Sequence, residues 1–371
     1  MNIRYILANL LLIISFSIHP HNPCTQFPRI NLGTFPTPIC KLNNLGSELG
    51  IDQLYMKCDN KCGITTTSGQ YFGGNKIRKL EFLLADALKQ NKHSVITIGC
   101  AGSNHVVATG SSCAQCDLKC HAIIRNQPNS PVAQRNLKLM CHYNIALHPV
   151  TSSEERNHLY STFTDPTTNE KPYQIPVGGS CPIGVLGFVN AAFELKEQIE
   201  NRLLPEPDYI FVPVGSCGTS AGLLLGLKLA QLKSKVISVA IEPDTTHFYT
   251  SRIKELYTQT AQLLQITDLP ILSDDDICIE YAHTGLEYGQ WTDEAYQAIE
   301  LLKYHEKIIL DGTYSAKAFA ALLDYANNRF LDNKTVLFWN TFCAEDFTSI
   351  TDTIDYHKLP DALQQYFDAT V

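Results

Sequence analysis

The sequence predicts an α/β fold in which parallel sheets are covered by helices, and two observations carry this prediction. First, runs rich in β-branched residues alternate along the chain with segments whose apolar residues recur at helical spacing, which is typical of βαβ units. Second, two of the expected strands run directly into short stretches of glycine and hydroxyl residues that open a helix. The loops at the carboxyl ends of parallel strands usually carry the functional site.

The elements follow one another in a regular order. The first strand is short and leads through a polar loop, residues 58–70, to a helix that starts beside a pair of glycines. After that, each β-rich run is followed by a helical one. We expect strands at residues 53–57, 94–98, 120–124, 144–150, 209–214, 236–241 and 335–339. We expect helices at residues 42–49, 77–88, 132–140, 154–162, 191–201, 249–264, 293–304 and 316–327, one that starts at residue 106, and a leucine-rich one that ends at residue 232.

The composition bounds the class of protein. The chain has 371 residues, which suits one or two α/β domains. Hydrophobic residues make up 44% of it and charged residues 18%, as in ordinary globular proteins. The net charge of −8 and the lack of a basic stripe argue against a nucleic-acid partner.

Thirteen cysteines are dispersed along the chain and do not form evenly spaced pairs. We interpret them as reduced, buried small hydrophobes, which favours a cytoplasmic protein. Cys113 and Cys116, followed by Cys120 and His121, raise the alternative of a zinc site. The second pair of ligands is missing, so we expect core packing and no metal. Asp274–Asp276 reads as a solvated loop.

The N-terminus favours another location. An apolar run, Tyr5–Ile18, is too short for a comfortable membrane span. It resembles the hydrophobic region of a secretory signal, with Ser15–Ser17 as a candidate cleavage site and prolines after it. The alternative is an extension without function, or an upstream start codon. Residues 1–23 should not belong to the fold in either case. The protein would be exported if they act as a signal, and would meet a membrane only if the apolar segment is retained.

The most informative stretch is Gly73–Glu81, with the sequence GGNKIRKLE. The two glycines permit a tight approach and a positive φ, and Asn75 suits the N-cap of the following helix. Lys76 then lies in the first helical turn, where the positive end of the macrodipole favours the neutral amine. A neutral lysine can attack a carbonyl and form a Schiff base. The alternative is a solvated lysine in a basic run with Arg78 and Lys79.

A second informative stretch, Gly215–Gly222, follows the buried strand at residues 209–214. Its residues are small and open a helix, so the backbone amides are free to face one anion, best a phosphate. It is not a P-loop, because Gly-Lys-Ser/Thr is absent, and it lacks the G-x-G-x-x-G dinucleotide fingerprint. We therefore expect a phosphate cup without a lysine. The alternative is a tight strand–helix connection with no ligand.

A third stretch, Gly99–His105, follows the strand at residues 94–98 in the same way. Ser103 and Asn104 should stand at a helix N-terminus, where amides and hydroxyls can bind a carboxylate. The alternative is that Ser103 only caps the helix. Together, a Schiff-base lysine, a phosphate cup and a carboxylate turn are what pyridoxal phosphate and a small amino-acid substrate require.

With these motifs the chain resembles the family of 1-aminocyclopropane-1-carboxylate deaminase and D-cysteine desulfhydrase, which are pyridoxal phosphate enzymes of the tryptophan-synthase-β-like fold (fold type II). The resemblance implies two three-layer α/β domains with parallel sheets, and a homodimer. A large cofactor-binding domain would comprise residues 24–79 and 188–371, and a small substrate-side domain residues 80–187. The resemblance runs from about residue 27 to residue 343 and rests on residues 73–81, 102–105, 176–180, 215–219 and 310–315.

The resemblance also implies roles. Lys76 would hold the cofactor aldehyde and relay protons, Asn104 would bond the ring hydroxyl, and Ser103 would contact the substrate or a carbanion. Tyr288 and Tyr314 match two active-site tyrosines, although either could be a buried core phenol. The implied catalytic residues are Lys76, Ser103, Tyr288 and Tyr314; the cofactor-binding residues are Asn75, Lys76, Asn104, Gly215, Ser216, Cys217, Gly218, Thr219, Ser220 and Ser315; the substrate-binding residues are Gly102, Ser103, Asn104, His105 and Gly179.

Ser315 helps to choose among reactions, because it falls where the family places the partner of the pyridine nitrogen. The cyclopropane deaminase has a glutamate there, whereas a hydroxyl supplies no charge to keep that nitrogen protonated. A weaker electron sink suffices when a β-leaving group departs directly. We therefore expect α,β-elimination from a small amino acid such as D-cysteine, releasing a 2-oxo acid, ammonia and sulfide. Thr341, where the deaminase has leucine, points the same way.

Two alternatives stay open: a 1-aminocyclopropane-1-carboxylate deaminase, and a pyridoxal phosphate-binding protein with little turnover. Three positions depart from both named enzymes, and the first two, expected beside the cofactor and substrate, leave the particular substrate open. Gly102 replaces a glutamine, Asn340–Cys343 replaces a His-Thr-Gly-Gly turn, and Cys58–Asn60 replaces an Arg-Asp-Asp-like run.

Overall fold

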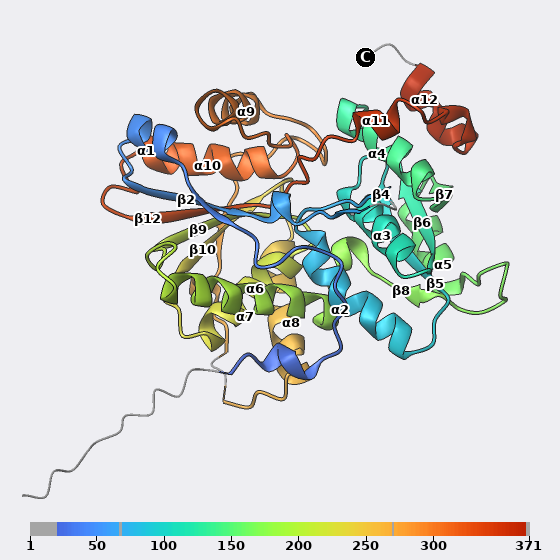
Figure 1. The fold of residues 1–371 in the computed structure, drawn as a ribbon, viewed down its shortest axis with the longest axis horizontal. Helices are drawn as coiled ribbons and strands as arrows, with labels where there is room; N and C mark the ends of the chain where they lie inside the picture. The colour runs from blue at the N-terminus through green and yellow to red at the C-terminus, as the bar shows by residue number, and fades with distance from the viewer. Residues whose placement is uncertain (1–20, 67–68, 269–270, 369–371) are drawn as a thin grey trace, which may run out of the picture.

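Two mainly parallel sheets frame the computed structural model, which describes residues 21–66, 69–268 and 271–368 (Figure 1). The larger sheet has the order β1-β2-β12-β9-β10-β11, and only its β1–β2 pair is antiparallel. The smaller sheet has the order β7-β6-β5-β8 and is parallel throughout. A separate antiparallel pair joins β3 and β4. The strands are β1 (Ile39–Lys41), β2 (Gln53–Cys58), β3 (Thr65–Thr66), β4 (Gly69–Gln70), β5 (Ser94–Cys100), β6 (Lys119–Arg125), β7 (Ala146–Val150), β8 (Tyr173–Gln174), β9 (Tyr209–Val214), β10 (Lys235–Ala240), β11 (Cys278–Glu280) and β12 (Thr335–Asn340).

Helices cover both faces of the larger sheet (Figure 1). Strand β12 illustrates the layering, since its alternate residues point to opposite faces. Phe338 packs against Phe319 on one face, and Trp339 packs against Phe188 on the other. One layer consists of α1 (Asn43–Leu49), α9 (Asp293–Glu306) and α10 (Ser315–Asn327), and the other of α6 (Pro182–Glu200), α7 (Gly218–Leu229) and α8 (Phe248–Leu263).

The smaller sheet is also a central layer. Its core on one face joins β5 and β6 to α2 (Lys76–Lys89), α3 (Asn104–Gln115) and α4 (Pro131–His142). On the other face Ile96 and Ile98 pack with residues of α5 (Ser153–Thr162). The predicted α/β architecture is therefore confirmed. The 3-10 helices are Pro23–Gln26, Asp59–Lys61, Val177–Gly179, Asp274–Asp276 and Tyr356–Lys358.

Helix α6 begins nine residues before the predicted start at residue 191. Two glycines in this first part of the helix permit close approaches. A Cβ at Gly187 would lie 2.2 Å from the carbonyl oxygen of Arg78 on α2, and one at Gly184 would lie 2.0 Å from that of Gly179 in the preceding turn. Gly187 therefore serves helix–helix packing, and Gly184 lets the start of α6 pack against the turn.

The predicted boundaries of the small domain stay a proposal, although both fall inside helices. The boundary at residues 79–80 falls inside α2 and that at residues 187–188 inside α6. The C-terminal helices α11 (Thr348–Thr351) and α12 (Asp361–Asp368) were not predicted, and they lie beside α4 (Figure 1). Leu363 and Tyr366 share a core with Leu137 of the smaller unit. We propose that residues 347–368 belong to that unit, since a large-domain assignment conflicts with this packing.

The fold begins before residue 24, although residues 1–23 were expected to lie outside it. Asn22 donates a hydrogen bond from Nδ2 to Oδ1 of Asn190 at 2.8 Å, and Cys24 is buried. The expected signal-like run, Tyr5–Ile18, lies outside the described residues. Among those that are described, no helix has both the length and the apolar character required to cross a bilayer.

A buried ion network shows that residues 58–70 are more than a polar loop. Arg78 donates to both carboxylate oxygens of Asp59, at 2.9 and 2.7 Å, and to Glu194 at 2.9 Å. Lys57 also pairs with Glu194, and Trp339 donates from its indole nitrogen to Asp59 at 2.8 Å. The network therefore connects α2 to β2, to α6 and to β12.

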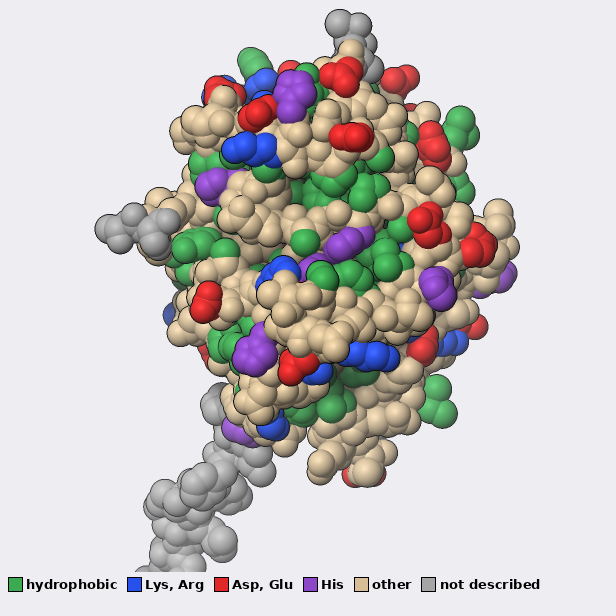
Figure 2. All heavy atoms as spheres, turned by 90° about the vertical axis from the view of Figure 1, so that its right-hand side faces the viewer, with side chains coloured by type: hydrophobic (Ala, Val, Ile, Leu, Met, Phe, Trp, Pro, Cys, Tyr) green, Lys and Arg blue, Asp and Glu red, His purple; other side chains and the backbone are tan. Residues whose placement is uncertain are grey.

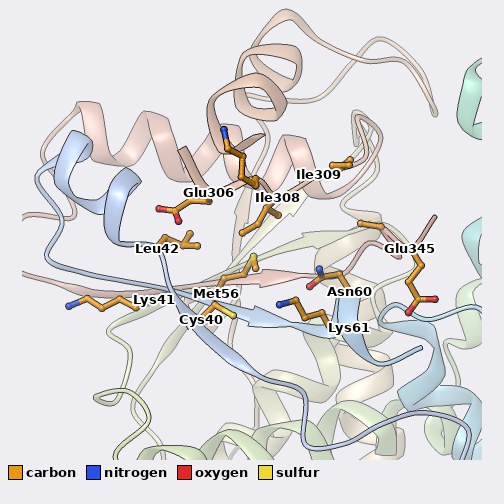
Figure 3. Close-up of a pocket in the computed structure, with 12 residues that line it drawn as sticks. Cys40, Lys41, Leu42, Met56, Asn60, Lys61, Glu306, Ile308, Ile309 and Glu345 are labelled. Carbon is orange, nitrogen blue, oxygen red and sulfur yellow. The ribbon is translucent and has the colours of Figure 1, made fainter. Parts of the chain in front are cut away.

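All thirteen cysteines are free, as predicted, but Cys278 is exposed and not buried. The thiol of Cys58 donates to the sulfur of Cys40 at 3.2 Å. A cavity of about 570 Å³ lies beside the β1–β2 edge of the larger sheet, and Cys40 and Lys61 are part of its lining (Figure 3). None of the predicted site residues lines this cavity. This cavity gives reagents access to Cys40.

We expect Cys40 to be alkylated by iodoacetamide at pH 7 before the more exposed Cys278. The hydrogen bond from Cys58, helped by Lys61 and opposed by burial, lowers the pKa of Cys40 to about 6, so its thiolate forms above that pH. Burial and Glu280 raise the pKa of Cys278. The thiolate is the reactive form. Peptide mapping by mass spectrometry measures the order, and Cys58→Ala should slow labelling of Cys40. Faster labelling of Cys278, with no effect of Cys58→Ala, would contradict this prediction.

Charges on the face of the molecule beside the smaller sheet are mixed. Figure 2 shows lysines and arginines interspersed with acidic side chains and histidines on this face, with no continuous basic stripe. Within the described ranges no three His, Cys, Asp or Glu side chains are grouped so as to hold a metal ion.

Candidate active site

A cleft of about 750 Å³ gathers most of the predicted site residues. Its walls include the carboxyl ends of β5 and β9 and the loops that follow them, which is where the sequence placed the site. The predicted residues on its wall are Asn75, Lys76, Ser103, Asn104, His105, Gly215, Ser216, Cys217, Thr219, Tyr288 and Tyr314. Gly102, Gly179, Gly218, Ser220 and Ser315 are not part of the wall.

Lys76 is the first residue of α2 and lines the cleft. Burial lowers its pKa to about 8, against the opposing effect of Asp311, so much more of the amine is neutral at neutral pH than in a solvated lysine. The neutral amine was expected from the position of Lys76 in the first helical turn, and burial also favours it.

Asn75 does not cap α2 with its side chain, contrary to prediction. It has helical backbone angles, and its N–H donates to the carbonyl of Thr341 at 3.1 Å. The side-chain amide instead donates to the hydroxyl of Thr219 at 3.4 Å. Gly74, at φ +86°, makes the turn that sets this direction. Asn75 therefore connects the lysine helix to the glycine-rich loop.

The glycine-rich loop turns sharply between β9 and α7. Cys217 has φ +67° and makes no side-chain cap, so its side chain satisfies none of the first amides of α7. The hydroxyl of Ser180 accepts from the N–H of Gly218 at 3.2 Å and donates to Ser216 at 2.8 Å. Ser220 is fully buried and bonded to Ser238 at 2.8 Å, so its hydroxyl does not face the cleft.

A lysine does lie beside this loop, although the sequence predicted a cup without one. Nζ of Lys79 donates to the carbonyl of Gly178 and to the hydroxyl of Ser180, both at 3.0 Å. It would lie 2.7 Å from a Cβ at Gly218. Burial and the nearby Lys76 lower its pKa well below the usual value. Within the described chain Lys79 has no carboxylate partner, so an anion in the loop would favour its protonated form. These donors fit a phosphate.

The turn before α3 provides a second helix N-terminus. Ser103 caps α3 by accepting from the N–H of Val106 at 3.3 Å, which is the alternative that the sequence left open beside a carboxylate-binding role. Asn104 accepts from the amide of Asn136 at 2.9 Å. His105 is buried and bonded to Thr97 at 2.9 Å. Burial, together with Lys76 and Lys79, lowers the pKa of His105 well below 6.5, so this imidazole stays neutral.

Tyr288 and Tyr314 meet in the cleft, with hydroxyl oxygens 2.8 Å apart. They are therefore not simply core phenols. Burial raises the pKa of both, so each phenol remains protonated. A protonated phenol in a cleft can donate to a developing anion.

Asp311 is a cleft residue that the sequence reasoning missed. Its carboxylate accepts from the N–H of Tyr314 at 2.9 Å and from the hydroxyl of Ser315 at 2.6 Å. Ser315, the first residue of α10, is fully buried by these contacts. Two signals could have found it: Asp311 falls in the stretch 310–315 that carries the resemblance, and it stands just before a helix, where a carboxylate commonly caps.

Comparisons with known proteins agree on one family. The profile described as "Pyridoxal-phosphate dependent enzyme" matches residues 30–341. The D-cysteine desulfhydrase of Serratia proteamaculans is 32% identical over 324 residues, which cover 85% of this chain and 94% of that protein. The crystal structure of an ACC deaminase homologue is 30% identical, with a TM-score of 0.73, and the match covers 93% of this chain and 98% of that one.

More distant structures share the fold alone. Threonine deaminase isoform 2 from Solanum lycopersicum is 16% identical, with a TM-score of 0.60 over 89% of this chain and 86% of that chain. The match to the family spans most of the chain and includes Lys76 and the glycine-rich loop. The predicted fold type II and the predicted cofactor are thereby confirmed, and the chain belongs to the pyridoxal-phosphate-dependent enzymes.

Proposed function

We propose that the protein is a lyase that eliminates the β-substituent of a small amino acid. Its first candidate substrate is D-cysteine, from which it would release a 2-oxo acid, ammonia and sulfide. One observation carries the proposal: the partly neutral amine of Lys76 lines the same cleft as the loop at residues 215–219. The amine can hold the aldehyde of pyridoxal phosphate while the loop holds its phosphate.

The groups in and beside the cleft have separate roles in binding and proton transfer. Once bound, pyridoxal phosphate supplies an electron sink for negative charge at the substrate Cα. Lys79 and the first amides of α7 hold the phosphate. Ser103 and the N-terminus of α3 orient the substrate carboxylate. Lys76, with a pKa of about 8, takes the proton from Cα, and the protonated phenol of Tyr288 donates to the departing thiolate.

Ser315 does not decide between elimination and ring opening, because its hydroxyl donates to the carboxylate of Asp311 at 2.6 Å and is not part of the cleft wall. The likeness to a D-cysteine desulfhydrase over 85% of the chain supports elimination. The likeness to an ACC deaminase homologue favours 1-aminocyclopropane-1-carboxylate deamination as the second candidate.

The proposal is tested by giving the cofactor-loaded enzyme both enantiomers of cysteine and serine, and 1-aminocyclopropane-1-carboxylate. We expect equal amounts of sulfide and pyruvate from D-cysteine. Release of 2-oxobutanoate from the cyclopropane substrate without sulfide from cysteine would replace the proposal by the deaminase. Cofactor absorbance without any product would leave a binding protein with little turnover.

We expect Lys79→Met to weaken binding of pyridoxal phosphate by about 10- to 100-fold, since hydrogen bonds to charged groups contribute about 1.5–3 kcal/mol. Titration of the cofactor-free protein, followed by absorbance, measures this. Binding of pyridoxal, which lacks the phosphate, should change little. Lys89→Met, on the exposed end of the same helix, is the matched control. An equal loss for both ligands would show that Lys79 does not act on the phosphate.

We also propose a homodimer in a reducing, cytoplasmic compartment. The dimer is supported only by the family resemblance. The compartment is supported by thirteen free cysteines. Light scattering tests the first proposal, and a reporter fused behind residues 1–23 tests whether they direct export.

A further inference from the structure

Gly102 leaves a space at the N-terminus of α3, and a side chain from another loop fills it. A Cβ at Gly102 would lie 2.7 Å from Nε2 of Gln127 and 3.1 Å from its Cδ. Gln127 comes just after the end of β6, the strand that pairs with β5. It lines the cleft together with Ser103 and Asn104. Its amide therefore occupies the place that a side chain at residue 102 would enter.

The hydrogen bond between these residues fixes the direction of the amide. The N–H of Gly102 donates to Oε1 of Gln127 at 2.9 Å. Because Oε1 is used here, the two hydrogens of Nε2 point elsewhere. In the described structure Nε2 has no hydrogen-bond partner. It would lie 3.6 Å from a Cβ at Gly289, so the loop that carries Tyr288 is its other neighbour.

The main chain at Gln127 is also held firmly. Its N–H donates to the hydroxyl of Tyr366 at 2.9 Å, and that hydroxyl donates to the carbonyl of Gln127 at 2.8 Å. Tyr366 lies on α12 and is buried. Asn129 and Gln134 bind the carbonyl of Tyr366 at 2.9 and 2.7 Å. The C-terminal helix thus anchors a cleft residue whose donor is free.

We propose that Gln127 is a substrate-binding residue whose Nε2 donates to the α-carboxylate of the amino acid, in the place of a side chain at residue 102. This assignment rests on the function proposed above. The N-terminus of α3 and Ser103 attract a carboxylate to this point. A carboxylate oxygen there accepts from Nε2 while Oε1 keeps its bond to Gly102. The rival role is a brace that only supports the turn through Oε1.

Gln127→Glu separates the two roles, because it keeps the acceptor for Gly102 and the main-chain bonds but replaces the donor by a negative charge. The cofactor-loaded protein is titrated with alanine, which has no leaving group, and with ethylamine, which is alanine without its carboxylate. The change in cofactor absorbance reports binding, and the enantiomer of alanine that wild type binds more tightly is used.

We expect Gln127→Glu and Gln127→Ala to weaken alanine binding by about 10- to 100-fold, the range for a hydrogen bond to a charged group, and to leave ethylamine binding within about threefold. Adding Gly102→Gln to Gln127→Ala should restore most of the alanine affinity. Gln365→Glu, the same charge change at an exposed site on α12, is the control and should match wild type.

Alanine binding by Gln127→Glu equal to that of wild type would establish the brace and overturn this assignment alone. Equal losses for alanine and ethylamine would overturn it too, as a general distortion of the cleft. Wild type that holds the cofactor but never responds to alanine would overturn the proposed function together with this assignment. If Gln127→Ala fails to fold, Gln127→Glu decides, because it retains every observed bond of residue 127.

Discussion

Replacing Lys76 by alanine is expected to remove the absorbance band of covalently held pyridoxal phosphate and to lower turnover by at least about 10²- to 10⁴-fold, the usual contribution of a positioned acid–base group. The fold should survive, because Lys76 lines the cleft and, among the described residues, its amine makes no hydrogen bond that would be lost. Absorbance and circular dichroism of the purified variant measure both effects. A spectrum identical to that of wild type would refute the assignment.

The same amine predicts a pH dependence. Burial lowers the pKa of Lys76 to about 8, so the neutral nucleophile accumulates as the pH rises through that value. Capture of pyridoxal phosphate by the cofactor-free protein should accelerate up to about pH 8 and then level off. Stopped-flow absorbance measures the rate, and Lys89→Ala should follow wild type. A rate that keeps rising toward pH 10.5 would mean that Lys76 is an ordinary solvated lysine.

Local patterns predicted the parts of the site that are continuous in sequence. The loop after β9 and the turn before α3 each follow a strand and open a helix, so their chemistry could be read without tertiary contacts. Lys79 could not be recognised, because in the run from Lys76 to Lys79 it looks like another surface lysine. Only the packing of α2 against α6 places it beside the loop.

Contacts between distant segments explain the other misses. Asn75 is of a residue type that commonly caps helices. Its hydrogen bonds, however, join it to Thr341 and Thr219, which follow it by more than one hundred residues in the sequence. Gln127 stands in a polar loop without a pattern, and its role depends on the absence of a side chain at Gly102. The family resemblance showed that residue 102 is a glycine in place of a glutamine, and the tertiary structure shows Gln127 in the space this leaves.

The second large effect, on stability, is expected in the buried ion network around Arg78. Arg78→Met should destabilise the protein by about 3–5 kcal/mol, because it leaves Asp59 and Glu194 as buried carboxylates without their main partner. Both are at most 9% exposed. Chemical denaturation measures the loss. Arg329→Met, which breaks an exposed pair with Asp332, should cost less than about 1 kcal/mol.

The pH dependence of this loss identifies its cause. Burial acts to raise the pKa of Glu194, but Arg78 and Lys57 outweigh it and hold that pKa at about 2. A depressed carboxyl pKa stabilises the fold above the unfolded value of about 4.3 and loses this contribution as the pH falls toward 2. Without Arg78 the pKa of Glu194 rises, because burial is then opposed mainly by Lys57, and protonation relieves the less compensated charge. The stability gap between wild type and Arg78→Met should therefore narrow between pH 7 and pH 4. A gap that stays constant over this range would assign the loss to packing around Arg78 and not to its charge.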